Sequence, residues 1–128
     1  MIQGIGVDLC SISRMEKAVE SAHFSHRVFS PEEIQYACRK ARPARHFAGC
    51  FAAREAFSKA SGISMYSLAF GGGMWIERTG SAPIVRCSQT VLDLLPHKGT
   101  ERIHLSLSHD GDYAVAMVVL VVRLQQTL

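Results

Sequence analysis

The closing segment of the chain carries the pattern that most restricts the fold. Residues Ile103–Ser108 alternate between apolar and polar side chains, Asp110-Gly111 favours a tight turn, and Tyr113–Leu124 is rich in valine. The apolar run from Tyr113 to Val122 is about half as long as the roughly 20 residues that a membrane-spanning helix needs. We therefore expect an antiparallel hairpin whose second strand is buried.

Upstream of this hairpin, helix and strand signals occur in separate blocks. Strands are expected at Ile2–Asp8, Met74–Arg78 and Ile84–Cys87, and glycine inside the first strand marks close approach of another backbone or a ligand. The expected helices run from Ser11 or Ser13 to about Ala22, from Ser30 to near Pro43, from about Ala44 to Ala60, and from Ser88 to Pro96. Such blocks predict one α+β domain over residues 1–128, an antiparallel sheet packed with helices.

Composition narrows the class of partner. Apolar residues make up 48% of the 128 positions, enough to fill a core, which excludes a disordered chain. The net charge of +3 favours an anionic partner, but only 8% of residues are aromatic and no dense basic stripe is present, so nucleic acid is not expected. The N-terminus lacks the basic start of a signal peptide, and neither secretion nor a membrane is expected.

The cysteines indicate the compartment. Cys10, Cys38, Cys50 and Cys87 are too widely spaced for a CxxC zinc or redox motif. We interpret them as reduced thiols of a cytoplasmic protein.

The segment Phe47–Ala60 contains the first candidate functional residues. Phe51, Glu55 and Lys59 are four residues apart and therefore share one face of the expected helix, beside a stripe of alanines. From spacing alone an ion pair between Glu55 and Lys59 is the favoured interpretation. The functional alternative is a carboxylate that holds a cation, with an ammonium group nearby for a phosphate.

Asp8 is the second candidate, because it follows the first strand and precedes a helix. A lone aspartate at such a place usually caps a helix or forms a turn. If Asp8 converges with Glu55, however, the two carboxylates suit Mg²⁺, which binds one or two carboxylates together with water and substrate phosphates.

The final hairpin supplies the third group. His104, Ser106 and Ser108 share one face of its first strand, and His109 lies beside the turn, where its ring can reach a ligand. A solvent-exposed sheet surface is the alternative for each of these residues. A zinc site and a Ser-His-Asp triad have little support, because neither close ligand spacing nor a nucleophile elbow is present.

Basic residues are the last group. They cluster as Arg39, Lys40, Arg42 and Arg45, with Arg14, Lys17 and Arg27 elsewhere; such clusters are solvated surfaces or binding sites for an acidic partner.

In this order, these segments resemble the holo-acyl-carrier-protein synthase family of phosphopantetheinyl transferases. The resemblance begins at Gly4-Ile5-Gly6-Val7-Asp8, is strongest at Phe51–Ala60, which contains Arg54-Glu55-Ala56 and Lys59, and ends at His104–Asp110. It covers nearly the whole chain. No single motif is decisive, but the three together are fairly specific.

The resemblance implies an activity. Members of this family transfer 4′-phosphopantetheine from coenzyme A to a serine of apo acyl carrier protein, releasing 3′,5′-ADP, in fatty-acid or polyketide biosynthesis. By position, Asp8 and Glu55 would hold Mg²⁺ and Lys59 would neutralise phosphate charge. Ser108 and His109 would lie along the nucleotide. The general base is left open, with Glu55 one candidate.

The resemblance also implies partners. Arg14, Phe24 and Arg27 match positions that meet the acidic recognition helix of the carrier protein. Family members are usually homotrimers in which neighbouring subunits share each active site.

The chain departs from the family pattern at three places. Cys50 stands where relatives often have arginine, Ser61-Gly62-Ile63-Ser64 replaces a Gly-Thr-Gly turn, and Gly80-Ser81-Ala82-Pro83 replaces Gly-Lys-Pro. These changes motivate an alternative function, a non-catalytic module that binds coenzyme A or a carrier protein on the same fold.

Overall fold

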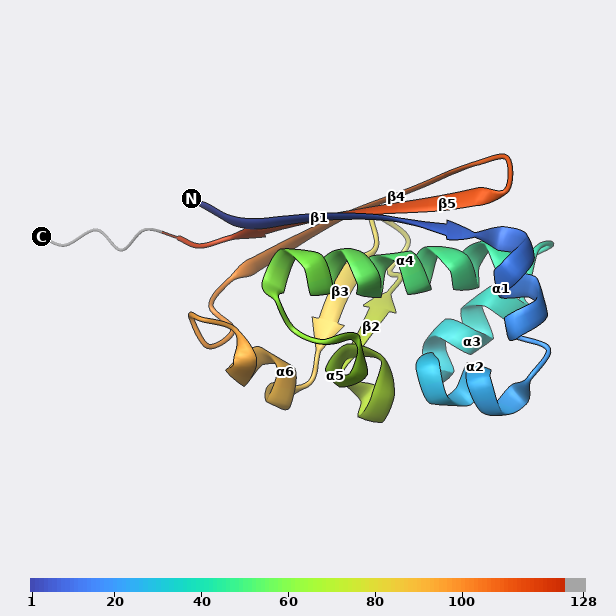
Figure 1. Cartoon of the computed structure of the whole chain (residues 1–128), viewed down its shortest axis with the longest axis horizontal. Helices are drawn as coiled ribbons and strands as arrows, with labels where there is room; N and C mark the ends of the chain where they lie inside the picture. The colour runs from blue at the N-terminus through green and yellow to red at the C-terminus, as the bar shows by residue number, and fades with distance from the viewer. Residues whose placement is uncertain (124–128) are drawn as a thin grey trace, which may run out of the picture.

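A long helix lies between two layers of strands and short helices. The structure is a computed structural model that describes residues 1–123. One layer is an antiparallel sheet with strand order β1-β5-β4, formed by β1 (Ile2–Ser11), β5 (Tyr113–Val121) and β4 (Arg102–Asp110). Helix α4 (Pro43–Ser61) runs along one face of this sheet (Figure 1).

The remaining elements lie on the other side of α4 (Figure 1). They are α1 (Ile12–Ala18), α2 (Ala22–Val28), α3 (Pro31–Cys38), α5 (Met65–Ala69), the 3₁₀ helix η1 (Phe70–Gly72), the two-stranded sheet β2 (Met74–Glu77) and β3 (Ile84–Cys87), and α6 (Gln89–Leu94). The α+β architecture with antiparallel sheets is therefore confirmed. Among residues 1–123, no helix combines the length and hydropathy that crossing a bilayer requires.

Helix α4 is buried because its own apolar and small residues cover several of its faces. Its buried positions include Phe47, Ala48, Ala52, Ala56 and Phe57, which lie on several faces of the helix. A helix that is apolar all round belongs in a core between two layers. Proline at the first turn begins α4, and Gly62, with φ of 79°, ends it in the left-handed conformation.

The large sheet has one buried face and one exposed apolar face. On β5, the four buried residues Ala114, Ala116, Val118 and Leu120 pack toward α4. Tyr113 and Met117 are exposed and Val115, Val119 and Val121 are half-buried, so the expectation of a buried strand holds for four of its nine residues. Ile5, Val7 and Leu9 of β1 are also exposed on this outer face, at 55–61% of their accessible surface.

Two glycines let β1 touch the backbone of α4. A Cβ atom at Gly4 would lie 2.0 Å from the carbonyl oxygen of Ala60, and one at Gly6 would lie 1.8 Å from that of Ala56. Two strand residues advance about 6.6 Å and four helix residues about 6 Å, so the contacts stay in step as the chains run antiparallel. The close backbone approach predicted from these glycines is confirmed.

Several element boundaries differ from the predictions. The helix expected from Ser11 or Ser13 to about Ala22 ends earlier, at Ala18, and an additional helix that was not expected, α2, begins at Ala22 after its capping residue Ser21. Helix α3 ends at Cys38, before the expected stop near Pro43. The second strand of the final hairpin ends at Val121, and Leu124 lies outside the described residues.

Candidate functional site

Asp8, Glu55 and Lys59 come together where β1 passes over α4. Because Gly6 faces Ala56 and Gly4 faces Ala60, Asp8, two residues further along the same strand face, projects toward the turn of α4 that carries Glu55. Lys59 Nζ donates to Asp8 Oδ1 at 3.1 Å and to the carbonyl oxygen of Val7 at 3.0 Å. Lysine 59 therefore pairs with Asp8, and the predicted Glu55–Lys59 ion pair was wrong.

Asp8 also has a different structural role from the one expected. It lies inside β1, opposite Ala116, and neither ends a strand nor caps a helix. Its side chain is held toward α4, so the convergence with Glu55 that a cation site needs is present.

The pKa of Glu55 is raised above its ordinary value. Burial is the main cause, the negative charge of Asp8 adds to it, and Lys59 opposes the shift. Charge repulsion from Asp8 therefore reaches Glu55, and a bound cation would relieve it. Among residues 1–123, no group of three or more His, Cys, Asp or Glu side chains is placed to hold a metal ion.

A hollow of about 470 Å³ opens beside the two carboxylates. It is lined by Asp8, Leu9, Cys10, Ser11, Arg14, Met15, Ala18, Phe24, Phe51 and Glu55. Asp8 and Glu55 are called the acid pair. Arg14 and Phe24, two of the three predicted carrier-binding residues, thus border the same hollow as the acid pair. Arg27 does not: its guanidinium lies over the ring of Phe70, 4.6 Å from the centroid, and borders a different hollow.

The hairpin tip fixes the wall of the 470 Å³ hollow that α1 provides. The carboxylate of Asp112 accepts hydrogen bonds from Ser11 Oγ at 2.8 Å and from the Ser13 backbone N–H at 2.9 Å, and these bonds lower the pKa of Asp112. Sequence reasoning missed this residue, because the contact joins positions about 100 residues apart.

Ser108 and His109 lie at the other edge of the sheet. They border a separate hollow of about 220 Å³ together with Arg45, His46 and Arg78. Strand β5 lies between β4, which carries His109, and β1, which carries Asp8, so two strand spacings of about 4.8 Å separate them. Within one chain, the structure therefore does not bring Ser108 and His109 to the acid pair.

The hollow beside His109 is strongly basic. Burial lowers the pKa of His46, and the positive charges of Arg78, Lys40 and Arg45 lower it further. Such a cluster of cations is suited to an anion. His46 and Arg78 were missed in the sequence, although Arg45 belonged to the basic group noted there, and its extension by one helical residue would have found His46.

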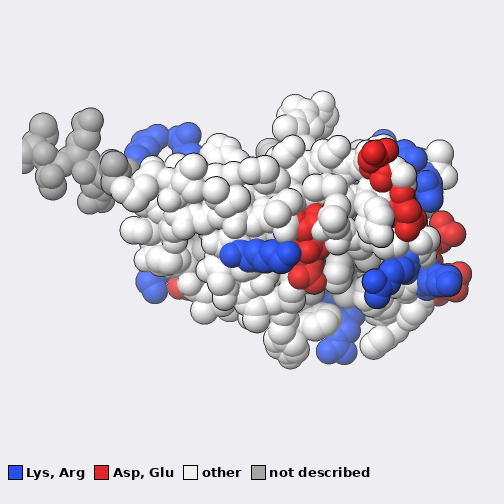
Figure 2. Space-filling model, turned by 45° about the horizontal axis from the view of Figure 1, so that its top comes forward, with Lys and Arg blue, Asp and Glu red and all other residues white. Residues whose placement is uncertain are grey.

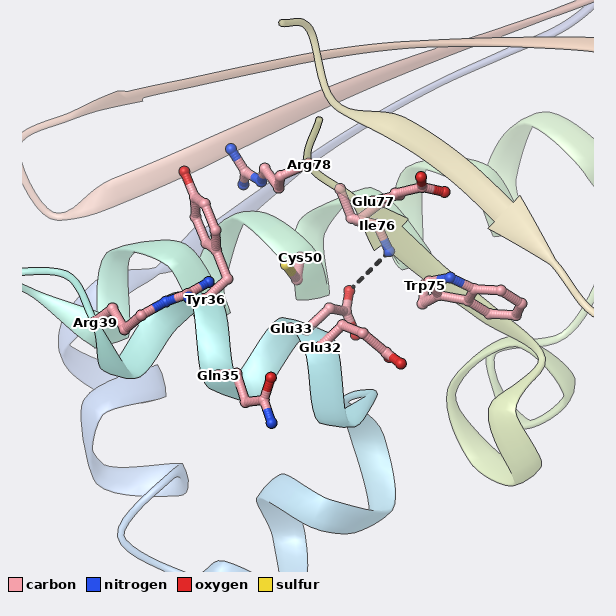
Figure 3. A pocket seen from close by; sticks show the side chains of 10 residues that line it. All are labelled: Glu32, Glu33, Gln35, Tyr36, Arg39, Cys50, Trp75, Ile76, Glu77 and Arg78. Atoms are coloured by element: carbon pink, nitrogen blue, oxygen red, sulfur yellow. Dashed lines mark hydrogen bonds between the residues drawn. The ribbon is translucent and has the colours of Figure 1, made fainter. Parts of the chain in front are cut away.

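A third hollow, of about 430 Å³, lies between α3 and β2 (Figure 3). Tyr36 of α3 and Arg39, which follows it, border one side, Trp75 of β2 and Arg78, which follows that strand, border the other, and Cys50 lies at the inner side. Burial raises the pKa of the Cys50 thiol to about 12, so the thiol stays protonated. Arg78 borders both this hollow and the basic one.

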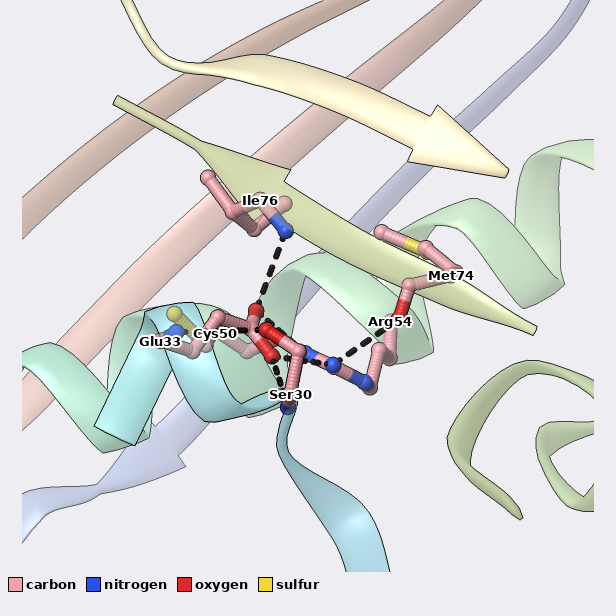
Figure 4. Close-up of polar contacts among 6 residues, drawn as sticks. All are labelled: Ser30, Glu33, Cys50, Arg54, Met74 and Ile76. Carbon is pink, nitrogen blue, oxygen red and sulfur yellow. Dashed lines mark hydrogen bonds and ion pairs between the residues drawn. The ribbon is translucent and has the colours of Figure 1, made fainter. Parts of the chain in front are cut away.

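A buried ion pair holds these elements together. Arg54 of α4 and Glu33 of α3 are 1% and 3% exposed, and the guanidinium donates to both carboxylate oxygens, at 2.9 and 2.5 Å (Figure 4). Glu33 also accepts the backbone N–H of Ile76 at 3.1 Å, and Arg54 donates to the carbonyl oxygen of Met74 at 2.9 Å. The pair thereby fixes α3, α4 and β2 relative to one another.

The outer surface of the sheet is mostly uncharged. Figure 2, in which this surface is turned partly toward the viewer, shows a broad area without charged side chains and, near the middle of the view, a basic side chain beside acidic ones. The exposed apolar residues of β1 and β5 form this area.

Known proteins match this chain over nearly its whole length. A protein from Geotalea daltonii named holo-[acyl-carrier-protein] synthase is 41% identical over 128 residues, covering 94% of this chain and 98% of that protein. One of the same name from Geobacter sulfurreducens is 38% identical, with the same coverage.

Solved structures agree with these relatives. The crystal structure of a holo-(acyl-carrier-protein) synthase from Bacillus anthracis, in complex with coenzyme A (3′,5′-ADP), aligns with a TM-score of 0.74 at 33% identity, covering 94% of this chain and 96% of that one. The Helicobacter pylori synthase in complex with coenzyme A aligns with a TM-score of 0.73 at 32% identity, covering 91% and 99%. A model of the 4′-phosphopantetheinyl transferase superfamily matches residues 4–118. The chain belongs to this superfamily.

Proposed function

We propose that this protein transfers 4′-phosphopantetheine from coenzyme A to a serine of apo acyl carrier protein, releasing 3′,5′-ADP. The observation that carries the proposal is the convergence of Asp8, Glu55 and Lys59 beside a hollow of about 470 Å³. Relatives with 38–41% identity are named for this activity, which supports it.

Asp8 and Glu55 are the residues that would hold Mg²⁺. Two carboxylates suit this ion, which completes its shell with water and substrate phosphates. The raised pKa of Glu55 beside Asp8 supports the fit, because the repulsion between the two groups favours a cation at this place. When bound, the ion supplies positive charge to the pyrophosphate of coenzyme A.

Glu55 and Lys59 carry the protein's share of the chemistry. The serine oxygen forms a bond to phosphorus while the phosphorus–oxygen bond to 3′,5′-ADP breaks, and the serine proton passes to a general base, for which Glu55 is one candidate. Lys59, 55% exposed at its side chain, neutralises charge on the leaving phosphate.

The nucleotide of coenzyme A is assigned to the basic hollow. Ser108, His109 and His46 border it, and Arg45 and Arg78 add the positive charge that phosphate groups require. Arg45, His46 and Arg78 extend the coenzyme A-binding set beyond Lys59, Ser108 and His109, which were inferred from the sequence.

The carrier protein is assigned to the surface around α1 and α2. Arg14 and Phe24 border the hollow of the acid pair, and Arg27 lies further along α2. A serine presented there would lie near Glu55, and basic residues at the rim suit an acidic helix.

We further propose that the protein is a homotrimer with shared active sites. The exposed apolar residues of β1 and β5, with Val7 55%, Leu9 61% and Met117 44% exposed, provide a surface for a second copy. Sharing also gives a reason why the acid pair and the basic hollow, the two half-sites, lie apart within one chain. The basic hollow of one chain can complete the acid pair of a neighbour. Four free cysteines agree with a cytoplasmic location.

Intact-protein mass spectrometry tests the transfer directly. Apo acyl carrier protein is incubated with the enzyme, coenzyme A and Mg²⁺, with and without EDTA. We expect the carrier to gain the mass of one phosphopantetheine, EDTA to prevent the gain, and Glu55→Gln to slow it at least about a hundred-fold while the variant stays folded. Normal turnover by the Glu55→Gln variant would refute the assignment of this carboxylate. Glu20→Gln, which replaces an exposed glutamate away from the hollow, is the matched control.

The same experiment separates the second candidate, a non-catalytic binding module. Cys50, buried where relatives often have arginine, is the observation that favours it. A module would bind coenzyme A without releasing 3′,5′-ADP or changing the mass of any carrier tested.

A further inference from the structure

Tyr36, near the end of α3, contacts three basic side chains from different parts of the chain. The guanidinium carbon of Arg78 lies 4.7 Å from the centre of the Tyr36 ring, and Lys40 Nζ lies 4.6 Å from it. The imidazole of His46 meets the same ring in an edge-to-face arrangement, with 5.4 Å between the two ring centres. One aromatic ring therefore links the end of α3 to the start of α4 and to the residue that follows β2.

Two of these partners border the basic hollow, but Tyr36 does not. Arg78 and His46 line the basic hollow together with His109, whereas Tyr36 lines the neighbouring hollow between α3 and β2. Figure 3 shows the side chain of Arg78 beside the ring of Tyr36. Tyr36 therefore supports the wall of the basic hollow from outside.

Arg78 has no acidic partner to hold it. The adjacent acid, Glu77, pairs with Arg86 at 2.6 Å, and Arg78 forms no ion pair within residues 1–123. None of the described residues that line the basic hollow is acidic. Burial lowers the pKa of His46, and the positive charges of Arg78 and Lys40 lower it further, so the cations here repel one another. The face of an aromatic ring attracts a cation without neutralising it, which leaves the charge of Arg78 for a ligand.

We propose that Tyr36 is a positioning residue of the nucleotide half-site: its ring holds the guanidinium of Arg78 at the wall of the basic hollow, where it binds a phosphate group of coenzyme A. Arginine has several rotatable bonds, and a guanidinium fixed before the ligand arrives loses less entropy on binding. Tyr36 itself does not touch the nucleotide. The inference rests on the proposed function, because it takes the basic hollow as the site of the nucleotide.

Calorimetric titration of the full chain with 3′,5′-ADP tests the inference without a chemical step. Tyr36→Leu removes the ring and is expected to weaken the affinity at least about three-fold, whereas Tyr36→Phe keeps the ring and should bind as the wild type does. Tyr66→Leu is the matched control, because the exposed ring of Tyr66 packs on Phe70 in another part of the molecule, and its affinity should be unchanged. Equal affinities of Tyr36→Leu and the wild type would overturn the inference.

A double substitution shows whether Tyr36 acts through Arg78. Arg78→Gln should itself weaken the binding of 3′,5′-ADP, and Tyr36→Leu added to it should have little further effect. In turnover assays, Tyr36→Leu should raise KM for coenzyme A by the factor seen in binding and leave kcat unchanged. Losses of affinity that multiply in the double variant, or a fall in kcat, would assign Tyr36 a general structural role and overturn the inference.

The wild type offers a measurement that needs no folded variant. Protons over the face of an aromatic ring resonate upfield, so the NMR signals of the Arg78 side chain should lie upfield of their ordinary positions and shift saturably with 3′,5′-ADP. Ordinary positions, or no response to bound 3′,5′-ADP, would overturn the inference alone. A wild-type chain that does not bind 3′,5′-ADP would refute the nucleotide assignment of the proposed function, and this inference with it.

Discussion

Glu55 shows how a single residue links the cost of folding to the proposed chemistry. Burial and the neighbouring Asp8 raise its pKa, so the folded protein holds the proton more tightly than the unfolded chain does. The folded state therefore binds more protons between the ordinary and the raised pKa, and the free energy of unfolding falls as the pH rises through this interval. A cation between the two carboxylates would remove part of this cost.

The first prediction follows from this sign. Glu55→Gln removes the charge, so the variant is expected to unfold at a higher temperature than the wild type at pH 7 to 8. At pH values below about 4, where the wild-type carboxyl is itself protonated, the difference should disappear. Thermal unfolding followed by circular dichroism over this pH range measures it.

The exposed Glu20 provides the comparison. Glu20→Gln should leave the unfolding temperature nearly unchanged at every pH, because this side chain has no bonded partner among the described residues. A Glu55→Gln variant less stable than the wild type at pH 7 would mean that the Glu55 carboxylate stabilises the fold, contrary to the argument.

At the scale of elements, the crossing of β1 over α4 sets the positions of the site residues. The absence of a side chain at Gly4 and Gly6 allows backbone contact, and Asp8, two residues beyond Gly6, is then carried to Glu55. The position of Asp8 relative to Glu55 therefore depends on Gly4 and Gly6, which have no side chains.

Replacement of Gly6 by alanine tests this dependence. The added Cβ would lie 1.8 Å from the Ala56 carbonyl oxygen, so strand and helix must separate. We expect the free energy of unfolding to fall by at least about 2 kcal/mol, and transferase activity to fall as well because Asp8 moves from Glu55. Urea denaturation measures the first effect and turnover the second.

Gly49→Ala is the matched control. Gly49 lies in α4, and its added Cβ would lie 4.0 Å from Leu107, an ordinary contact. Because alanine favours a helix over glycine, we expect a gain of roughly 0.5–1 kcal/mol. A loss at Gly49 as large as that at Gly6 would show that general crowding around α4, rather than the β1 contact, determines stability.

Local signals explain which elements the sequence predicted. The capping serine and proline before α3, the Gly62 stop of α4 and the Asp110-Gly111 turn act over a few residues, so the elements they mark were found. Helix α2 was not predicted, because the expected first helix was extended to Ala22 and included Ser21, which in the structure caps α2.

Distant contacts explain what the sequence did not predict. In the structure Glu33 forms a capping box with Ser30, a local contact, but its pairing with Arg54, 21 residues away, depends on packing between α3 and α4. In the same way, spacing paired Lys59 with Glu55, whereas the strand that crosses α4 offers Asp8 and a carbonyl oxygen instead.

At the scale of the whole molecule, the two half-sites lie at opposite edges of one sheet. The acid pair belongs to the β1 edge and the basic hollow to the β4 edge, with β5 between them. The proposed homotrimer, packed through the apolar outer face, would join the β1 edge of one copy to the β4 edge of another.

Mixing two inactive variants tests the proposed trimer. Glu55→Gln and His109→Ala chains, refolded together in equal amounts, should recover up to about a quarter of wild-type activity, because a shared site is intact only when each variant supplies its undamaged half. Glu55→Gln mixed with the doubly substituted chain should recover none. Light scattering should give the mass of three chains, and a monomer without recovery would exclude shared sites.

The pairing of β1 with β5 affects how the chain is made. Residues 2–11 find their partner strand only at residues 113–121, and the amino group of Met1 donates to the carbonyl oxygen of Val122 at 2.8 Å. Contacts between such distant segments slow folding, because a long loop must close before they form. During translation, β1 leaves the ribosome first and is therefore expected to stay unpaired until β5 has been synthesised. Its apolar side chains are exposed to chaperones during this interval.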